Sequence, residues 1–193
     1  MKKIVVFCGA SDGYADIYRE TAWDVGALLA RRGIEVIFGG GKVGIMGAVA
    51  DGALQHGGRV TGVIPTFLQT KEIAHDGITE MIVVNTMHER KQTMSRLADG
   101  VIALPGGWGT MEELFEMLTW AQLGLHTRPI GVLNVNGYYE PLKALCTLMV
   151  QDGFLSETTA SILMVADTLE ELLDMMANYT PPAAPQWLTD STT

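Results

Sequence analysis

The chain has 193 residues, of which 48% are hydrophobic and 18% charged, and its net charge is −9 at pH 7. This length fits one domain, and the acidic balance disfavours a sequence-independent grip on nucleic acid or on an anionic membrane. No stretch reaches the roughly 18 apolar residues of a membrane helix. Cys8 and Cys146 lack CxxC spacing and indicate reduced core thiols, so we expect a cytoplasmic protein without disulfides.

Apolar runs of strand length alternate with longer amphipathic stretches along the chain. The runs that predict strands are KIVVFCG, EVIFGGG, RVTGVIP, MIVVNT, VIALPGG, RPIGVLNV and ILMVAD. Each crossover between parallel strands needs a helix, so the alternation predicts a Rossmann-like, doubly wound α/β fold. We expect a mainly parallel sheet of about seven strands with helices on both faces.

Two segments depart from this rhythm. The stretch Thr66–Glu80 separates two strands without a clear helical stripe, and we interpret it as a lid or part of a partner surface. Residues 181–193 are rich in proline, alanine and polar residues and are typical of a flexible tail. Residues 1–180 are therefore predicted to form a single nucleotide-binding domain.

Glycines gather where three of the predicted strands end, at Cys8–Ser11, Gly39–Gly47 and Pro105–Thr110. In an open parallel sheet, ligands bind outside the carboxyl ends of the strands, where glycine turns and helix N-termini favour phosphate. The alternative is that the glycines only connect strand to helix. Taken together, the three turns predict a phosphate site.

The type of phosphate ligand is narrowed by two motifs. Gly39, Gly41 and Gly44 satisfy G-x-G-x-x-G, but no acid that could hold a ribose hydroxyl follows about twenty residues later, which disfavours a dinucleotide. No G-x-x-x-x-G-K-[ST] occurs, which disfavours ATP hydrolysis of the P-loop kind. This leaves a mononucleotide as the predicted phosphate ligand.

The stretch MHERK follows the fourth predicted strand. Thr86 and Glu89 have the spacing of a capping box, a structural role. Arg90 and Lys91, however, are cations in the first turns of a predicted helix, where they oppose its dipole. An unfavourable charge at the ligand-facing edge indicates function.

A second charged cluster follows the third glycine turn. Thr110 and Glu113 again have capping-box spacing, so a structural role for Glu113 stays open at this stage. Glu112 and Glu116 bring more negative charge than a cap requires, although Glu112, Glu113 and Glu116 would each interact favourably with the helix dipole. An arginine and a glutamate facing a nucleotide suit cleavage of an N-glycosidic bond, because a carboxylate can stabilise oxocarbenium charge or activate water. The histidines show no ligand spacing, and we expect no metal and no cofactor.

The motifs GGGKVGIMG, MHERK and PGGWGTMEE resemble, in order and spacing, the signature of the Lonely Guy family of cytokinin riboside 5′-monophosphate phosphoribohydrolases, long labelled "possible lysine decarboxylase". The resemblance implies hydrolysis of AMP or an N6-prenylated AMP to free base and ribose 5-phosphate by a homodimeric enzyme. It implies that Arg90 and Glu113 are the catalytic pair. The residues that it implies for substrate and phosphate binding are Ser11, Gly41, Gly44, Met87, Lys91, Gly106, Gly107, Gly109, Thr110 and Glu116.

Other interpretations of the motifs remain at this stage. A non-catalytic carrier or sensor of a phosphorylated nucleotide or pterin-type cofactor would use the same cradle but would not need the pair Arg90 and Glu113. The decarboxylase label is rejected, because neither Lys42 nor Lys91 lies in a recognisable pyridoxal phosphate motif. The resemblance implies a dimer, for which Thr119–His126 and Thr66–Glu80 are the candidate segments for the interface or for the edge of the pocket.

Overall fold

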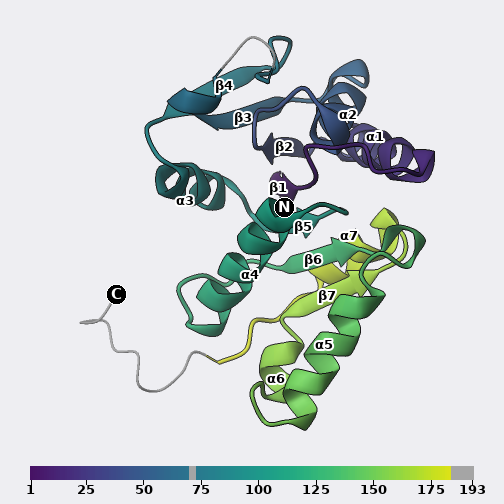
Figure 1. The fold of residues 1–193 in the computed structure, drawn as a ribbon, viewed down its shortest axis with the longest axis vertical. Helices are drawn as coiled ribbons and strands as arrows, with labels where there is room; N and C mark the ends of the chain where they lie inside the picture. Colours follow the sequence, from purple (N-terminus) through teal and green to yellow (C-terminus); the bar gives the residue numbers. More distant parts are fainter. Residues whose placement is uncertain (70–72, 184–193) are drawn as a thin grey trace.

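The computed structural model describes residues 1–69 and 73–183. Within these ranges seven strands form one parallel sheet in the order β4-β3-β2-β1-β5-β6-β7. The strands are β1 (Lys3–Phe7), β2 (Glu35–Phe38), β3 (Val60–Pro65), β4 (Glu80–Val84), β5 (Gly100–Ala103), β6 (Ile130–Leu133) and β7 (Leu163–Ala166). Figure 1 shows them in this order, from β4 at the top of the view to β7 below.

This order confirms the doubly wound Rossmann-like prediction. The chain moves from β1 outward to β4, returns to β5 on the other side of β1, and then moves outward to β7. The direction of winding therefore reverses between β1 and β5. Ligands of doubly wound sheets bind at such a switch point, and two of the glycine turns follow these two strands.

Helices follow the strands as the sequence periodicity predicts. They are α1 (Asp16–Arg31), α2 (Gly44–Gln55), α3 (Met87–Leu97), α4 (Trp108–Gln122), α5 (Glu140–Gln151), the short α6 (Glu157–Ala160) and α7 (Leu169–Ala177). One-turn 3₁₀ segments lie at Thr66–Leu68 and Val135–Gly137. In the described ranges no helix has both the length and the apolar character needed to cross a membrane.

The core consists of two apolar layers, one on each face of the sheet. Along β1, Ile4 and Val6 belong to a buried cluster with residues of α1, α2 and α7, whereas Val5 and Phe7 belong to a second cluster with residues of α3, α4 and α5. All four side chains are buried, which explains why the strands read as continuous apolar runs.

Helices α1 and α2 pack unusually closely. A Cβ added at Gly26 would lie 2.0 Å from the carbonyl oxygen of Val49, and one at Gly52 would lie 2.1 Å from that of Trp23. The two glycines therefore have a packing role between helices, separate from the glycines of the turns.

Two sequence predictions fall partly outside the described ranges. Of the predicted tail, residues 184–193 lie outside them, and so do residues 70–72 of the stretch Thr66–Glu80. The rest of that stretch includes the 3₁₀ turn and a short segment, Ile73–His75, that pairs with the second glycine turn.

Candidate active site

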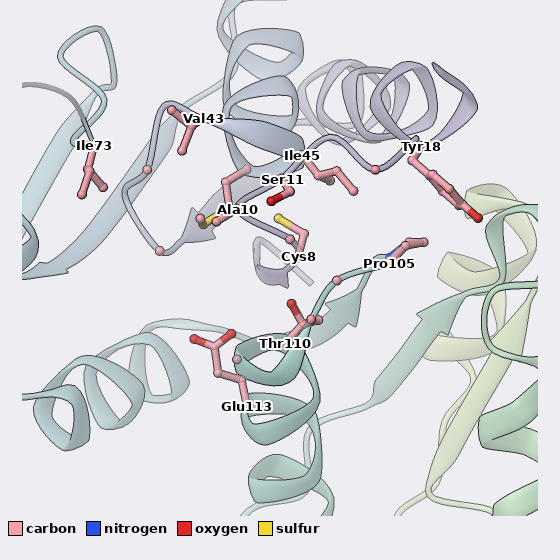
Figure 2. A pocket seen from close by; sticks show the side chains of 18 of the residues that line it. Cys8, Ala10, Ser11, Tyr18, Val43, Ile45, Ile73, Pro105, Thr110 and Glu113 are labelled. Carbon is pink, nitrogen blue, oxygen red and sulfur yellow. The ribbon is translucent and has the colours of Figure 1, made fainter. Parts of the chain in front are cut away.

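The three glycine turns converge on one cavity of about 680 Å³ at the carboxyl edge of the sheet. Figure 2 shows its lining, with Thr110 and Glu113 of α4 facing the turn that holds Ala10 and Ser11. The lining residues are Cys8, Gly9, Ala10, Ser11, Gly13, Tyr18, Gly39, Gly41, Val43, Ile45, Met46, Ile64, Leu68, Ile73, Arg90, Pro105, Gly106, Gly107, Gly109, Thr110, Glu113 and Tyr138.

The turns contact one another so closely that side chains are excluded between them. The Gly9 amide donates to the Pro105 carbonyl oxygen at 3.1 Å. A Cβ at Gly106 would lie 2.1 Å from Thr110 Oγ1, and one at Gly44 would lie 2.3 Å from the Ala10 carbonyl carbon. Gly44 also has φ +64°, a conformation that favours glycine. The glycines therefore bring three backbones together around one space.

Helix α4 points its N-terminus at this space. It begins at Trp108, with Gly107 as N-cap and no side-chain cap, so its first amides are not satisfied by a capping side chain. Unpaired amides and the helix dipole together favour an anion. This is the feature that a phosphate cradle requires.

The start of α4 also removes the capping explanation for Glu113. Because the N-cap is Gly107, Glu113 lies in the second turn of the helix, beyond the reach of the cap. At α3 a closely related cap does form: Thr86 Oγ1 accepts from the Glu89 amide at 3.1 Å, and Glu89 accepts from the amide of Asn85, the residue before the N-cap, at 2.8 Å. Glu89 therefore has a capping role and Glu113 does not.

Arg90 extends from the first turn of α3 across the ends of two strands. Its Nε donates to the Val63 carbonyl oxygen at 3.0 Å and its Nη2 to the Gly39 carbonyl oxygen at 3.0 Å. A Cβ at Gly39 would lie 1.9 Å from Nη2, so a larger residue there would displace the guanidinium. These bonds hold Nη1 at 3.8 Å from Glu113 Oε1, and both side chains are buried. The guanidinium is thus oriented by backbone and aimed at the carboxylate.

The Glu113 carboxyl is electrostatically unusual. Burial raises its pKa to about 7, an effect that Arg90 opposes, that Glu112 and Glu116 reinforce and that Lys91 opposes. A group with this pKa exists in both protonation states near neutral pH and can therefore exchange protons during a reaction.

Lys91 faces α4 rather than the cavity. It forms ion pairs with Glu112 and, at 3.0 Å, with Glu116, and its side chain is buried. Burial disfavours the charged ammonium, but the hydrogen bonds that Lys91 donates to the two glutamates, together with their negative charges, outweigh this and raise the pKa of Lys91. Of the two cations predicted at the start of α3, Arg90 thus lines the cavity and Lys91 joins α3 to α4.

The structure brings most of the predicted site residues to the cavity wall. Those that line it are Arg90, Glu113, Ser11, Gly41, Gly106, Gly107, Gly109 and Thr110. Gly44, Met87, Lys91 and Glu116 are not among the lining residues. Gly44 packs behind the first turn, and Met87 Sδ lies 4.0 Å from Arg90 Nη1. Direct nucleotide contact by these four residues stays a prediction.

Sequence reasoning missed two parts of the wall. Tyr18 and Tyr138 form an edge-to-face pair with ring centroids 6.1 Å apart, and Tyr138 Oη donates to the Gly106 carbonyl oxygen at 2.5 Å. The aliphatic residues Ile64, Leu68 and Ile73 also line the cavity. Tyr138 follows a strand at the ligand-facing edge and could have been predicted from that position, whereas Leu68 and Ile73 lie in the stretch Thr66–Glu80, whose departure from the strand–helix pattern did not single out either residue.

Comparison with known proteins relates the chain to a described family. The family described as "Possible lysine decarboxylase" matches residues 46–176. A probable cytokinin riboside 5′-monophosphate phosphoribohydrolase of Oryza sativa subsp. japonica is 45% identical over 180 residues, which cover 93% of this chain and 85% of that protein. A cytokinin riboside 5′-monophosphate phosphoribohydrolase of Arabidopsis thaliana is 47% identical over 181 residues, covering 93% of this chain and 83% of that protein.

A solved structure shares the fold at lower identity. The molybdenum cofactor binding protein from Rippkaea orientalis is 21% identical, with a TM-score of 0.68 over 92% of this chain and 97% of that chain. At this identity the likeness concerns the fold alone.

Proposed function

Since the chain belongs to the Lonely Guy family of cytokinin riboside 5′-monophosphate phosphoribohydrolases, we propose that it hydrolyses the N-glycosidic bond of nucleoside 5′-monophosphates. The products are the free base and ribose 5-phosphate. The substrates that we propose are AMP, N6-prenylated AMP, or both. The observation that carries the proposal is the buried pair of Arg90 and Glu113 beside the helix N-terminus that is suited to phosphate.

The substrate's phosphate would bind at the start of α4. Gly107 and Gly109 line the cavity there, and an added Cβ at either would meet no atom within 4 Å, so the backbone leaves open space for an anion. Thr110, buried in the same turn, carries a hydroxyl at the cavity wall. We assign phosphate binding to this turn together with the turn that contains Ser11.

Bond cleavage would take place one helical turn further along α4, at Glu113. As its carboxylate, Glu113 can stabilise positive charge on the ribose ring and accept a proton from the attacking water. The water oxygen then bonds to C1′, the bond from C1′ to nitrogen breaks, and the leaving base takes the electron pair of that bond and receives the proton that Glu113 removed from the water. A guanidinium is a poor proton donor, so the roles of Arg90 are charge neutralisation and orientation of Glu113.

A non-catalytic carrier is the principal alternative. A carrier needs the glycine turns and the helix N-terminus, but it has no use for a buried carboxylate whose pKa lies near neutrality. Such an arrangement costs stability and is typical of catalytic groups. The relatives that are 45% and 47% identical are named as hydrolases, which also favours the enzyme.

The decarboxylase description is not supported by the lysines. A Schiff-base lysine needs a lowered pKa, whereas the pKa of Lys91 is raised by its two glutamate partners. Among the described residues no lysine lines the cavity.

The quaternary structure and location are also proposals. We propose a homodimer that uses the end of α4 and the following loop, Thr119–His126, where Leu125 is 50% exposed. The described part of Thr66–Glu80 is the second candidate surface. Light scattering on wild type and Leu125→Asp tests the first surface, because a monomeric variant is expected only if this side chain lies in the interface. The free thiols Cys8 and Cys146 support a cytoplasmic location.

The activity is tested by incubating the protein with AMP and with N6-isopentenyl-AMP and measuring free base by chromatography. Wild type should release base, and Glu113→Gln and Arg90→Ala should each lose about 100-fold or more of the rate. Arg96→Ala, an exposed arginine on the same helix α3, and Glu20→Gln, an exposed glutamate of α1, are the matched controls. No base from either substrate, with nucleotide binding still visible by calorimetry, would instead support the carrier.

A further inference from the structure

A short segment after the 3₁₀ turn, Ile73–His75, is fastened to the second glycine turn. Gly41 and Ala74 form an antiparallel bridge. The Lys42 amide donates to the Ile73 carbonyl oxygen at 2.8 Å, and the His75 amide donates to the Gly40 carbonyl oxygen at 2.9 Å. The segment therefore adds one short backbone pairing to the turn that borders the cavity.

The His75 side chain ties this segment to helix α2. Its Nε2 lies 3.1 Å from Asp51 Oδ1, and its Nδ1 lies 3.1 Å from the Gly77 amide nitrogen. A neutral imidazole with its proton on Nε2 satisfies both contacts, because it donates to Asp51 and accepts from Gly77. The imidazole side chain is only 9% exposed, so water competes weakly for these bonds.

The residue that this attachment positions is Ile73, which lines the cavity although it is not held by apolar burial, being 37% exposed. The backbone pairing with the second glycine turn and the contacts of His75 fix the main chain beside this side chain. Figure 2 shows Ile73 and Tyr18 at opposite ends of the cavity, with Thr110 between them in the view.

The end of the cavity at Ile73 suits the base of the substrate. With phosphate at the start of α4 and cleavage at Glu113, the base is left with the part of the cavity on the far side of Glu113 from Thr110, and Figure 2 shows Ile73 on that side in the view. Ile73 is one of the aliphatic residues of the lining, together with Ile64 and Leu68. An apolar substituent on the base would find apolar contacts there.

We propose that His75 is a positioning residue that, through Asp51 and the second glycine turn, holds Ile73 as the wall of the base end and so sets the preference for an apolar base substituent. This inference rests on the proposed hydrolase function. His75 does not touch the reacting atoms, so its loss should affect recognition of the substituent and leave the chemical step unchanged.

The test compares kcat and KM for AMP and N6-isopentenyl-AMP in wild type, His75→Ala, Asp51→Ala and the double variant. In each variant we expect KM for N6-isopentenyl-AMP to rise about tenfold, the scale of a lost apolar contact, while kcat for both substrates stays within about twofold. The double variant should match the single ones, because both changes break the same link. Gln55→Ala, at the exposed end of α2, is the control and should resemble wild type.

The outcomes separate this inference from the proposed function. If wild type releases base from neither nucleotide, the proposed function fails and the inference fails with it. If wild type is active but the ratio of the two KM values is unchanged in the variants, the role of His75 is wrong and the hydrolase stands. A merely structural role would lower apparent kcat equally for both substrates through loss of folded protein. If His75→Ala does not fold, Asp51→Ala, whose carboxylate is 46% exposed, decides alone.

Discussion

Replacing Glu113 by glutamine should stabilise the protein at alkaline pH while abolishing activity. The pKa of this carboxyl is raised from 4.5 to about 7 in the folded protein, chiefly by burial. In the unfolded chain the group ionises near 4.5, so above that pH ionisation favours the unfolded state. The folded state is thus most stable, with respect to this group, below pH 4.5 and loses that advantage as pH rises through about 7.

The size of the effect follows from the same two values. Each pKa unit corresponds to about 1.4 kcal/mol, so ionised Glu113 reduces the free energy of unfolding by roughly 3 kcal/mol at pH 8. Glutamine is a neutral side chain of nearly the same shape and avoids this cost. We therefore expect Glu113→Gln to be about 2–4 kcal/mol more stable than wild type at pH 8, and nearly equal to it at pH 4.5.

Urea unfolding of both proteins between pH 4.5 and 8.5 measures the difference directly. Glu20→Gln, at an exposed position of α1, should show no such divergence with pH. Equal stability of wild type and Glu113→Gln at pH 8, or a gap that does not grow with pH, would refute the argument that burial of this carboxylate costs stability.

Three further changes test other parts of the site and fold. In wild type, kcat/KM should rise about tenfold per pH unit below pH 7 and level off above it, with a midpoint near the pKa of Glu113. Lys91→Met should move this midpoint to higher pH, because a positive charge near Glu113 is lost. Profiles of kcat/KM against pH measure both effects, and an unmoved midpoint would contradict the electrostatic role of Lys91. Gly109→Ala should leave the free energy of unfolding unchanged or slightly raise it, since its Cβ meets no atom within 4 Å. The same variant should raise KM for AMP severalfold because the added methyl group crowds the phosphate, and an unchanged KM would argue against a phosphate at this turn. Gly26→Ala should lower the free energy of unfolding by about 1–3 kcal/mol in urea, because its Cβ would lie 2.0 Å from the Val49 carbonyl oxygen, and a neutral result would mean that α1 and α2 can separate without cost.

Prediction succeeded wherever the signal was local. Strands buried on both faces are continuous apolar runs, so each strand in the described ranges could be found, and the alternation with helices required a parallel sheet. The turns were visible because close backbone approach requires glycine. Arg90 was found because its charge opposes the helix dipole, and the structure brings its guanidinium to the cavity.

The local pattern was not sufficient where a side chain's partners lie far along the chain. Lys91 carries the same charge signal as Arg90, but it pairs with Glu112 and Glu116, more than 20 residues away, and its contact with the nucleotide stays a prediction. Glu113 has the spacing of a capping box, but α4 begins at Trp108 with Gly107 as its N-cap, which removes that role. Local pattern therefore identified charged residues of interest without telling which one faces the cavity.

The sequence by itself determined the doubly wound parallel sheet, the edge at which the ligand site lies and the three glycine turns that build it, because periodicity and backbone sterics act over a few neighbouring residues. Only the tertiary structure decided the chemistry and shape of the cavity. Burial raises the pKa of Glu113 to about 7, Tyr138 of the cavity lining bonds to Gly106, and His75 bonds to Asp51 beside the second glycine turn. Burial and contacts across 24 or 32 residues arise when strands and helices assemble, and no local pattern encodes them.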